Sequence, residues 1–192
     1  MTPTALVEDK QLPLPDTLRR RNGWRLLSQR TVFTNGVFDL VHPGHLTYLA
    51  QAAGLGQRLI VGVNTDESVR RLKGNDRPVM PLAARMQLLA SLFFVDAVVA
   101  FDENTPLQLI QALRPDVLVK GGDYTVDEIV GATEVRGWGG EVRVLPFVEG
   151  ESTSGIVDRL RGGVMGAVCD GRCAMCDLRC AMCDGTTDAP QD

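Results

Sequence analysis

The chain has 192 residues, a length that suits one domain with a full hydrophobic core. Its formal net charge is -4 and its sequence pI is near 5.2, so no basic surface indicates nucleic acid or a membrane as a partner. Residues 1–15 carry three prolines and lack the apolar core of a signal peptide, which favours the cytosol.

From residue 31 onward, apolar segments of strand length alternate with segments of helical pattern. We expect strands at residues 31–34, 58–64, 96–101, 116–120 and 141–147. We expect helices at residues 43–55, 65–73, 82–94, 106–113, 127–136 and 152–161. This alternation predicts an α/β protein with a doubly wound, five-stranded parallel sheet. The domain is expected at residues 24–162, after an N-terminal extension (1–23) and before a tail (163–192).

Polar or glycine-rich loops follow four of the five predicted strands. They begin at Thr34, Asn64, Lys120 and Glu149. A glycine at one strand end is commonly a simple turn residue, but in a parallel sheet all four loops share the edge where ligands bind. No P-loop is present and no Gly-x-Gly-x-x-Gly follows the first strand, which argues against P-loop NTPases and dinucleotide-dependent dehydrogenases.

His42 and His45 are the only histidines, and they lie where the first predicted strand gives way to a helix. Pro43 suits the first position of that helix, whose open amides and dipole favour a phosphate group. Two histidines on one helix can also be buried polar residues or metal ligands. No third ligand lies nearby, and apolar residues separate Asp39 from the pair, so phosphate chemistry is favoured.

Ser152, Thr153 and Ser154 begin the last predicted helix. One hydroxyl is enough to cap a helix. All three hydroxyls, together with the open amides of the helix start, can also hold a polyphosphate. Both roles are compatible, because one residue can cap while its neighbours bind the anion.

These motifs resemble those of the cytidylyltransferase-like nucleotidyltransferases. Residues 34–45 are similar to their His-x-Gly-His signature, and Ser152-Thr153-Ser154 resembles their Ser-Thr-Thr-type motif, with serine replacing the second threonine. More specific segments resemble the heptose 1-phosphate adenylyltransferase family: residues 60–66, 71–78, 102–106, 114–124, 130–135 and 148–154. The resemblance covers about residues 24–161 and implies a Rossmann-like nucleotidyltransferase fold.

The resemblance implies transfer of AMP from ATP to heptose 1-phosphate, which gives ADP-heptose and pyrophosphate. A phosphate monoester is already an anionic nucleophile, so the protein must align two anions and stabilise developing charge. His42 and His45 would donate hydrogen bonds to phosphate oxygens. Lys73 would supply mobile and Arg85 fixed positive charge, with Mg2+ screening the polyphosphate. Lys73 and Arg85 rest on the resemblance alone, because such residues on a helix are commonly only solvated.

We group the expected site residues by role. The catalytic residues are His42, His45 and Lys73. The nucleotide-binding residues are Thr34, Asn35, Gly36, Phe38, Arg85, Ser152, Thr153 and Ser154, with Gly36 allowing close backbone approach. The substrate-binding residues are Asp39, Asn64, Asp66, Lys120, Asp123 and Tyr124; Asp39 either orients its loop or contacts the ligand, and the last three contact the sugar phosphate or the ribose. No metal-binding residue is expected.

Two other functions stay open. A cytidylyltransferase that acts on glycerol 3-phosphate or another small phosphoester shares the general motifs, although residues 120–124 and 148–150 favour the heptose branch. A non-catalytic nucleotide-binding sensor would keep the fold, and the retained histidines and hydroxyls argue against it. A homodimer is compatible with the resemblance. Many relatives carry a sugar kinase ahead of this domain, and residues 1–23 are too few for one, so a separate kinase is expected.

All five cysteines lie in the tail, at positions 169, 173, 176, 180 and 183. Two Cys-x-x-Cys pairs suggest zinc, but only three residues separate them, against about 12–20 in common zinc modules. The spacing also resembles iron–sulfur sites, although no barrel of the required size precedes it. A helix would place all five cysteines on one face, as in an amphipathic tail. A flexible extension that is dispensable for transfer is the preferred interpretation.

Overall fold

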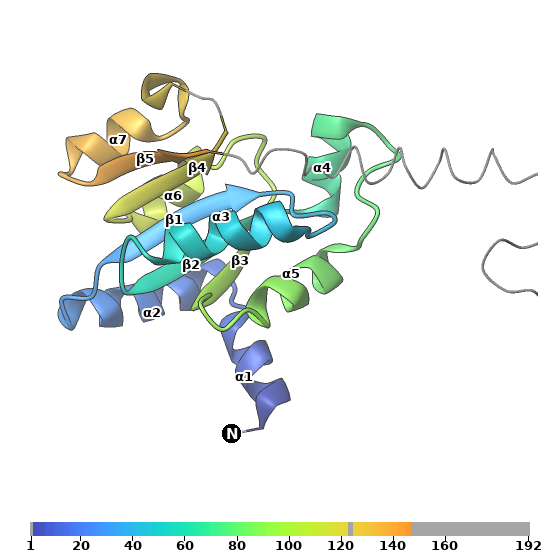
Figure 1. Cartoon of the computed structure of the whole chain (residues 1–192), viewed down its shortest axis with the longest axis horizontal. Coiled ribbons are helices and arrows are strands. Elements are labelled where there is room, and N and C mark those ends of the chain that lie inside the picture. The colour runs from blue at the N-terminus through green and yellow to red at the C-terminus, as the bar shows by residue number, and fades with distance from the viewer. Residues whose placement is uncertain (1, 123–124, 147–192) are drawn as a thin grey trace, which may run out of the picture. The chain divides into compact units, whose positions relative to one another are not determined.

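The computed structural model describes residues 2–122 and 125–146. In this part of the chain five parallel strands form one sheet in the order β3-β2-β1-β4-β5 (Figure 1). The strands are β1 (Thr31–Gly36), β2 (Arg58–Asn64), β3 (Ala97–Phe101), β4 (Val117–Gly121) and β5 (Glu141–Leu145). The predicted fold class and all five strands are confirmed; the bounds of β2 are as predicted, and those of the other strands differ by one or two residues.

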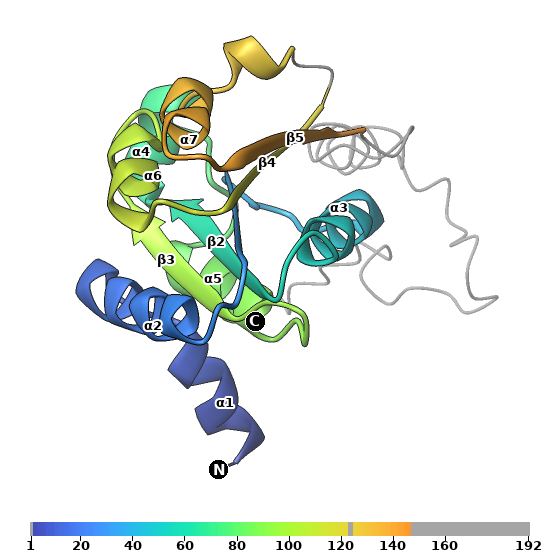
Figure 2. The same cartoon turned by 90° about the vertical axis from the view of Figure 1, so that its left-hand side faces the viewer.

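Helices cover both faces of this sheet (Figure 2). The helices of the described residues are α1 (Pro3–Lys10), α2 (Leu14–Leu26), α3 (Pro43–Ala53), α4 (Asp66–Lys73), α5 (Leu82–Ala90), α6 (Leu107–Leu113) and α7 (Ala132–Gly137), with the short 3-10 helix η1 (Val126–Glu128). The helix predicted over residues 127–136 is therefore divided. Gly131 lies between the two parts with a φ of 88°, a left-handed conformation that interrupts a helix.

Two apolar clusters lie on opposite faces of the sheet because successive strand residues point to opposite sides. Val32 and Val61 join side chains of α3 and α5 in the first cluster. Phe33 and Ile60 join those of α6 and α7 in the second. The near-continuous apolar sequence of the strands is thus explained by helices on both sides.

The N-terminal segment holds two helices that the sequence pattern did not predict. Prolines occupy the first turns of both α1 and α2, where a missing N–H costs no helical hydrogen bond. Thr17 and Arg21 of α2 are buried, and Arg21 donates a hydrogen bond to the Arg114 carbonyl at 2.8 Å. Leu14, Leu18 and Trp24 pack against the second apolar cluster. The boundary expected at residue 24 therefore falls within α2.

No helix in the described ranges has the length and apolar character needed to cross a membrane. The predicted helix at residues 152–161, the end of the last predicted strand at residue 147 and the cysteine tail lie outside the described residues.

Candidate active site

The connections between strands diverge beside β1, at the edge formed by the carboxyl ends of the strands. From β1 the chain passes through α3 to β2, whereas β4 lies on the other side of β1 and is reached through α6. Ligands of open α/β sheets bind where the connections diverge in this way. The loop after β1, which leads to the histidines, and the end of β4, which carries Lys120, both lie beside this divergence.

His42 and His45 lie together at the start of α3. The proline that follows His42 disfavours a helical backbone at that residue, and His42 has the extended φ and ψ of -130° and 170°. His42 is therefore the residue that precedes the helix, and His45 lies in its first turn. The centroids of the two imidazole rings are 3.9 Å apart. The rings of Phe38 and His45 are inclined at 62°, with 5.5 Å between their centroids.

His45 is uncharged at neutral pH. Burial, the neighbouring His42 and the positive charge of Lys73 together lower the pKa of His45 to about 4. Its Nδ1 atom is buried and has no hydrogen-bond partner among the residues that the structure describes. A neutral imidazole carries one N–H donor, and a buried polar atom of this kind is normally satisfied by a ligand or by water. A neutral His45 can therefore donate one hydrogen bond to a polar group bound at the start of α3.

Lys73 is the last residue of α4 and is exposed. Its charge lies near enough to His45 to contribute to the lowered pKa of that residue. An exposed ammonium on a long side chain is free to move toward a bound anion. The charge of Lys73 therefore acts at the histidine pair, and a direct role of Lys73 toward a bound phosphate stays a prediction.

Gly36 allows the Phe38 ring to lie against the end of β1. A Cβ atom added at Gly36 would approach the Phe38 Cε2 and Cζ atoms at 3.1 and 3.2 Å, which is tighter than ordinary contact. Phe38 itself has a φ of 49° and is buried. The close approach observed at Gly36 is therefore that of an aromatic ring.

Arg85 is fully buried and all three guanidinium nitrogens bind protein groups. Its Nε donates to the Met80 carbonyl at 3.0 Å, and Nη1 donates to the Val37 carbonyl at 2.7 Å. Its Nη2 forms an ion pair with Asp66 at 2.6 Å. Arg85 thereby joins the histidine loop, the start of α4 and the segment before α5. This placement indicates a residue that positions the loops, whereas the sequence suggested one that contacts the nucleotide.

Asp39 forms a second connection between the same loops. It accepts hydrogen bonds from the Val79 and Met80 amides at 2.8 and 2.9 Å and pairs with Arg77 at 2.8 Å. Burial opposes the charged carboxylate, but the two amides and Arg77 outweigh this and lower the pKa of Asp39. Of the two roles considered for Asp39, these contacts correspond to the first, in which the carboxylate orients its loop.

Thr34 and Asn64 are also engaged within the protein. The Thr34 hydroxyl shares a 2.5 Å hydrogen bond with the Tyr48 hydroxyl, which also donates to the Val119 carbonyl. Burial raises the pKa of Tyr48 to about 12. Asn64 is buried and donates to the Ser68 hydroxyl at 2.9 Å. These contacts connect β1 to α3 and β2 to α4.

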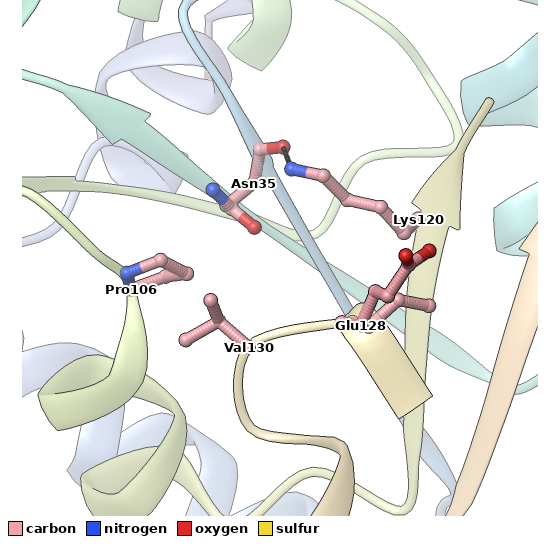
Figure 3. Close-up of a pocket in the computed structure, with 6 residues that line it drawn as sticks. Asn35, Pro106, Lys120, Glu128 and Val130 are labelled. Carbon is pink, nitrogen blue, oxygen red and sulfur yellow. Dashed lines mark hydrogen bonds between the residues drawn. The ribbon is translucent and has the colours of Figure 1, made fainter. Parts of the chain in front are cut away.

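Lys120 and Asn35 lie together at a small cavity between the ends of β1 and β4 on one side and Pro106 and residues 128–130 on the other (Figure 3). The Lys120 Nζ atom is 3.5 Å from the Asn35 carbonyl oxygen. Asp123, Tyr124, Ser152, Thr153 and Ser154 lie outside the described residues.

Sequence reasoning missed Arg77, Tyr48 and Glu128 as contributors to this edge. Arg77 pairs with Asp39, Tyr48 connects α3 to two strands, and Glu128 lines the cavity beside Lys120. The pair Arg77-Pro78 was noticed only as part of a resemblance. For Glu128, the Thr-x-x-Glu spacing at residues 125–128 was the available signal, because it is typical of a capping box.

Comparison with known proteins assigns the chain to a family. The model described as cytidylyltransferase-like matches residues 33–159. The chain belongs to the cytidylyltransferase-like family. The matched range includes the end of β1, the histidine pair and Lys120, so the family match and the site described above coincide.

Two curated relatives of this cytidylyltransferase-like chain are named bifunctional protein HldE. The protein from Koribacter versatilis is 56% identical over 136 residues, which are 71% of this chain and 28% of the relative. The protein from Methylobacillus flagellatus is 51% identical over 157 residues, which are 82% of this chain and 32% of the relative. The chain thus spans less than a third of the length of these relatives.

Two solved structures are similar in fold to the cytidylyltransferase-like chain. A lipopolysaccharide core biosynthesis protein from Thermoplasma volcanium has a TM-score of 0.52 and 27% identity, over 64% of this chain and 99% of that one. A pantoate-beta-alanine ligase from Francisella tularensis has a TM-score of 0.53 and 16% identity, over 76% and 69% of the two chains. The second likeness shows the fold alone.

Acidification should destabilise the protein through His45. Because the folded-state pKa is about 4 and the unfolded value is near 6.5, the unfolded chain binds more protons between these values. The free energy of unfolding should therefore fall as the pH is lowered from about 6.5 to about 4. The contribution of Asp39 is lost only below its ordinary value of 3.8, outside this window. Urea unfolding at several pH values should show that the free energy of unfolding depends less on pH in His45→Gln than in the wild type. Equal pH dependence in the two proteins would contradict this role of His45.

Removal of the Arg85 guanidinium should lower the stability of the folded protein and not only weaken the binding of a ligand. Arg85→Met leaves two carbonyls and Asp66 without their donor and should lower the free energy of unfolding by about 3 kcal/mol or more. Arg136→Met, which breaks a surface pair with Asp127, should cost less than about 1 kcal/mol. Urea titration compares them. Equal stability of the two variants, with ATP binding lost only in Arg85→Met, would identify Arg85 as a nucleotide ligand.

Proposed function

We propose that this cytidylyltransferase-like domain is a heptose 1-phosphate adenylyltransferase, which transfers AMP from ATP to heptose 1-phosphate. The observation that carries the proposal is the pair His42 and His45 at the start of α3, beside the divergence of the strand connections. The likeness to the bifunctional HldE proteins supports the branch that residues 120–124 and 148–150 indicate.

In the proposed reaction an oxygen of the sugar phosphate attacks the α-phosphorus of ATP. The new P–O bond forms as the bond to the pyrophosphate group breaks, and pyrophosphate leaves with the electron pair. No proton has to be removed from the nucleophile, so catalysis consists of alignment and stabilisation of charge. His42 and His45 supply hydrogen bonds, and the amides at the α3 start add their partial positive charge.

The uncharged state of His45 suits this role. A neutral imidazole donates a hydrogen bond without the tight ion pairing that would hold the ground state as strongly as the transition state. Lys73 then provides mobile charge for the polyphosphate from the end of α4. Asn35, Gly36, Phe38, Ser152, Thr153 and Ser154 are proposed to contact the nucleotide, and Lys120, Asp123 and Tyr124 to contact the sugar phosphate or the ribose.

Mg2+ is proposed to enter with ATP as part of the substrate. In the described ranges no group of three or more His, Cys, Asp and Glu side chains is arranged to hold a metal ion. The phosphates of ATP are strong ligands for Mg2+, which usually takes only one or two protein carboxylates at such sites. When bound, the metal ion would neutralise charge on the polyphosphate.

The heptose 1-phosphate must come from a phosphorylating reaction on a sugar. We propose that another active site of the sugar kinase class supplies it, and that the reaction takes place in the cytosol, where ATP is available. The substrates proposed are small molecules only.

Pyrophosphate release tests the proposal directly. The protein should release pyrophosphate when ATP and heptose 1-phosphate are both present, and more slowly with other nucleoside triphosphates. His42→Ala and His45→Ala should each lower kcat about 100–1,000-fold, with less effect on the KM for ATP, because the donors matter most as charge develops. A coupled assay for pyrophosphate measures each parameter.

Gln51→Ala provides the matched control, because Gln51 is an exposed residue of the same helix. It should keep wild-type kinetics. Unchanged turnover in both histidine variants would remove the pair from the mechanism. Faster turnover with CTP and glycerol 3-phosphate would refute the heptose assignment, and ATP binding without pyrophosphate release would indicate a nucleotide sensor.

A further inference from the structure

The cavity beside the ends of β1 and β4 has the size of a single sugar unit. Its volume is about 180 Å³, and its walls are formed by Asn35, Pro106, Lys120, Glu128, Ile129 and Val130. At about 30 Å³ for each water molecule, this space holds about six waters. Such a volume suits the ring of a monosaccharide and is small for a nucleoside triphosphate.

The polar groups at this cavity are complementary to hydroxyls. Figure 3 shows Asn35, Lys120 and Glu128 around the same space. The Lys120 ammonium only donates hydrogen bonds, the Glu128 carboxylate only accepts them, and the Asn35 amide does both. A sugar hydroxyl is a donor and an acceptor, so neighbouring hydroxyls can use all three side chains. Pro106 and Val130 supply apolar surface for the C–H groups of a sugar ring.

The balance of charge distinguishes the body of a sugar from its phosphate. A phosphate group at this cavity would be attracted by Lys120 but repelled by the Glu128 carboxylate, since one positive and one negative side chain line the same space. An uncharged polyhydroxylated group gains from both. The cavity therefore differs from the histidine end of the site, where Lys73 adds positive charge.

Glu128 is held in place before any ligand binds. Its carboxylate accepts a hydrogen bond from the Thr125 amide at 3.0 Å, and the Thr125 side chain completes a capping box at the start of η1. These hydrogen bonds lower the pKa of Glu128, so the group is a carboxylate at neutral pH. A carboxylate fixed in this way loses little conformational entropy on binding a hydroxyl.

Among the residues that the structure describes, Lys120 has few hydrogen-bond partners. Burial lowers its pKa, and its one hydrogen bond in the described part of the chain is the long contact with the Asn35 carbonyl. No carboxylate of the described residues forms an ion pair with it. A half-buried ammonium with three hydrogens and one weak acceptor gains from a ligand that brings further oxygens.

We propose that this cavity binds the uncharged, hydroxyl-bearing body of the sugar 1-phosphate, with Lys120 donating to and Glu128 accepting from its hydroxyls. The assignment of this sugar-body cavity rests on the proposed function. It gives the two parts of the sugar 1-phosphate separate binding places. The sugar is selected beside η1, and its phosphate is left for the histidine end of the same sheet edge. Glu128 and Lys120 are then specificity-determining residues.

The test compares Glu128→Gln with Asp127→Asn. Glutamine keeps the size of Glu128 and the capping box, and it removes the carboxylate. The KM for heptose 1-phosphate should rise about 10-fold or more, because a hydrogen bond to a charged acceptor is weakened, while the KM for ATP stays within about twofold. Asp127 is an exposed neighbour that pairs with Arg136, so Asp127→Asn should match the wild type. Urea unfolding of both variants confirms that they remain folded.

Calorimetry separates this inference from the proposed function. Heptose 1-phosphate, mannose 1-phosphate and inorganic phosphate are titrated into the wild type, Glu128→Gln and Lys120→Met. The sugar phosphates should bind each variant about 10-fold or more weakly, and inorganic phosphate should bind all three proteins alike. If no pyrophosphate is released but the sugar phosphates still show this pattern, the proposed function fails and the sugar-body cavity stands.

Other results would overturn the sugar-body cavity. Product formation with a change confined to the KM for ATP would assign the cavity to the nucleotide. An equal loss of affinity for inorganic phosphate in Lys120→Met would make it a phosphate subsite. Failure of the wild type to bind any sugar 1-phosphate would refute the cavity and the proposed function together.

Discussion

A buried cation organises the ligand edge of the sheet. Arg85 is removed from water, which is costly for a charged group unless its donors are satisfied. Its bonds to Val37, Met80 and Asp66 compensate for that cost and specify where three separate segments lie. The loop that leads to the histidines cannot move independently of α4, and Asp39 reinforces the connection through Arg77. Such rigidity is what preorganised charge stabilisation requires.

The charged groups of the site differ in whether they are used within the protein or are available to a ligand. The Arg85 guanidinium is neutralised by protein groups and is not available to bind a ligand. His45 is half-buried and uncharged, and Lys73 lies exposed at the end of α4. A protein with a net charge of -4 can therefore receive anionic substrates, because the donors and the mobile charge are concentrated at one edge. Away from the histidines, the balanced pair Lys120 and Glu128 suits an uncharged part of the ligand.

The sequence was sufficient where a pattern is local. The apolar strand at residues 58–64 matches β2, and the His-Pro pair places the start of α3 correctly. It was insufficient for α2, whose apolar residues are interrupted by a run of arginines, although Arg21 is in fact buried. The family resemblance suggested Arg85 as a source of positive charge but indicated no partner for it within the protein. Its partners Val37 and Asp66 are 48 and 19 residues distant in the chain, so only the fold reveals that the guanidinium is used internally.

A crystal structure with a non-hydrolysable ATP analogue and Mg2+ tests the central claim most directly. The account predicts that the phosphates lie at the start of α3, with an imidazole nitrogen of His45 about 2.7–3.2 Å from a phosphate oxygen. It also predicts that Arg85 keeps its bonds to Val37 and Asp66 and that the sugar-body cavity stays free of the nucleotide. Phosphates bound at Lys120 and Glu128, with His45 remote from every phosphate oxygen, would contradict it.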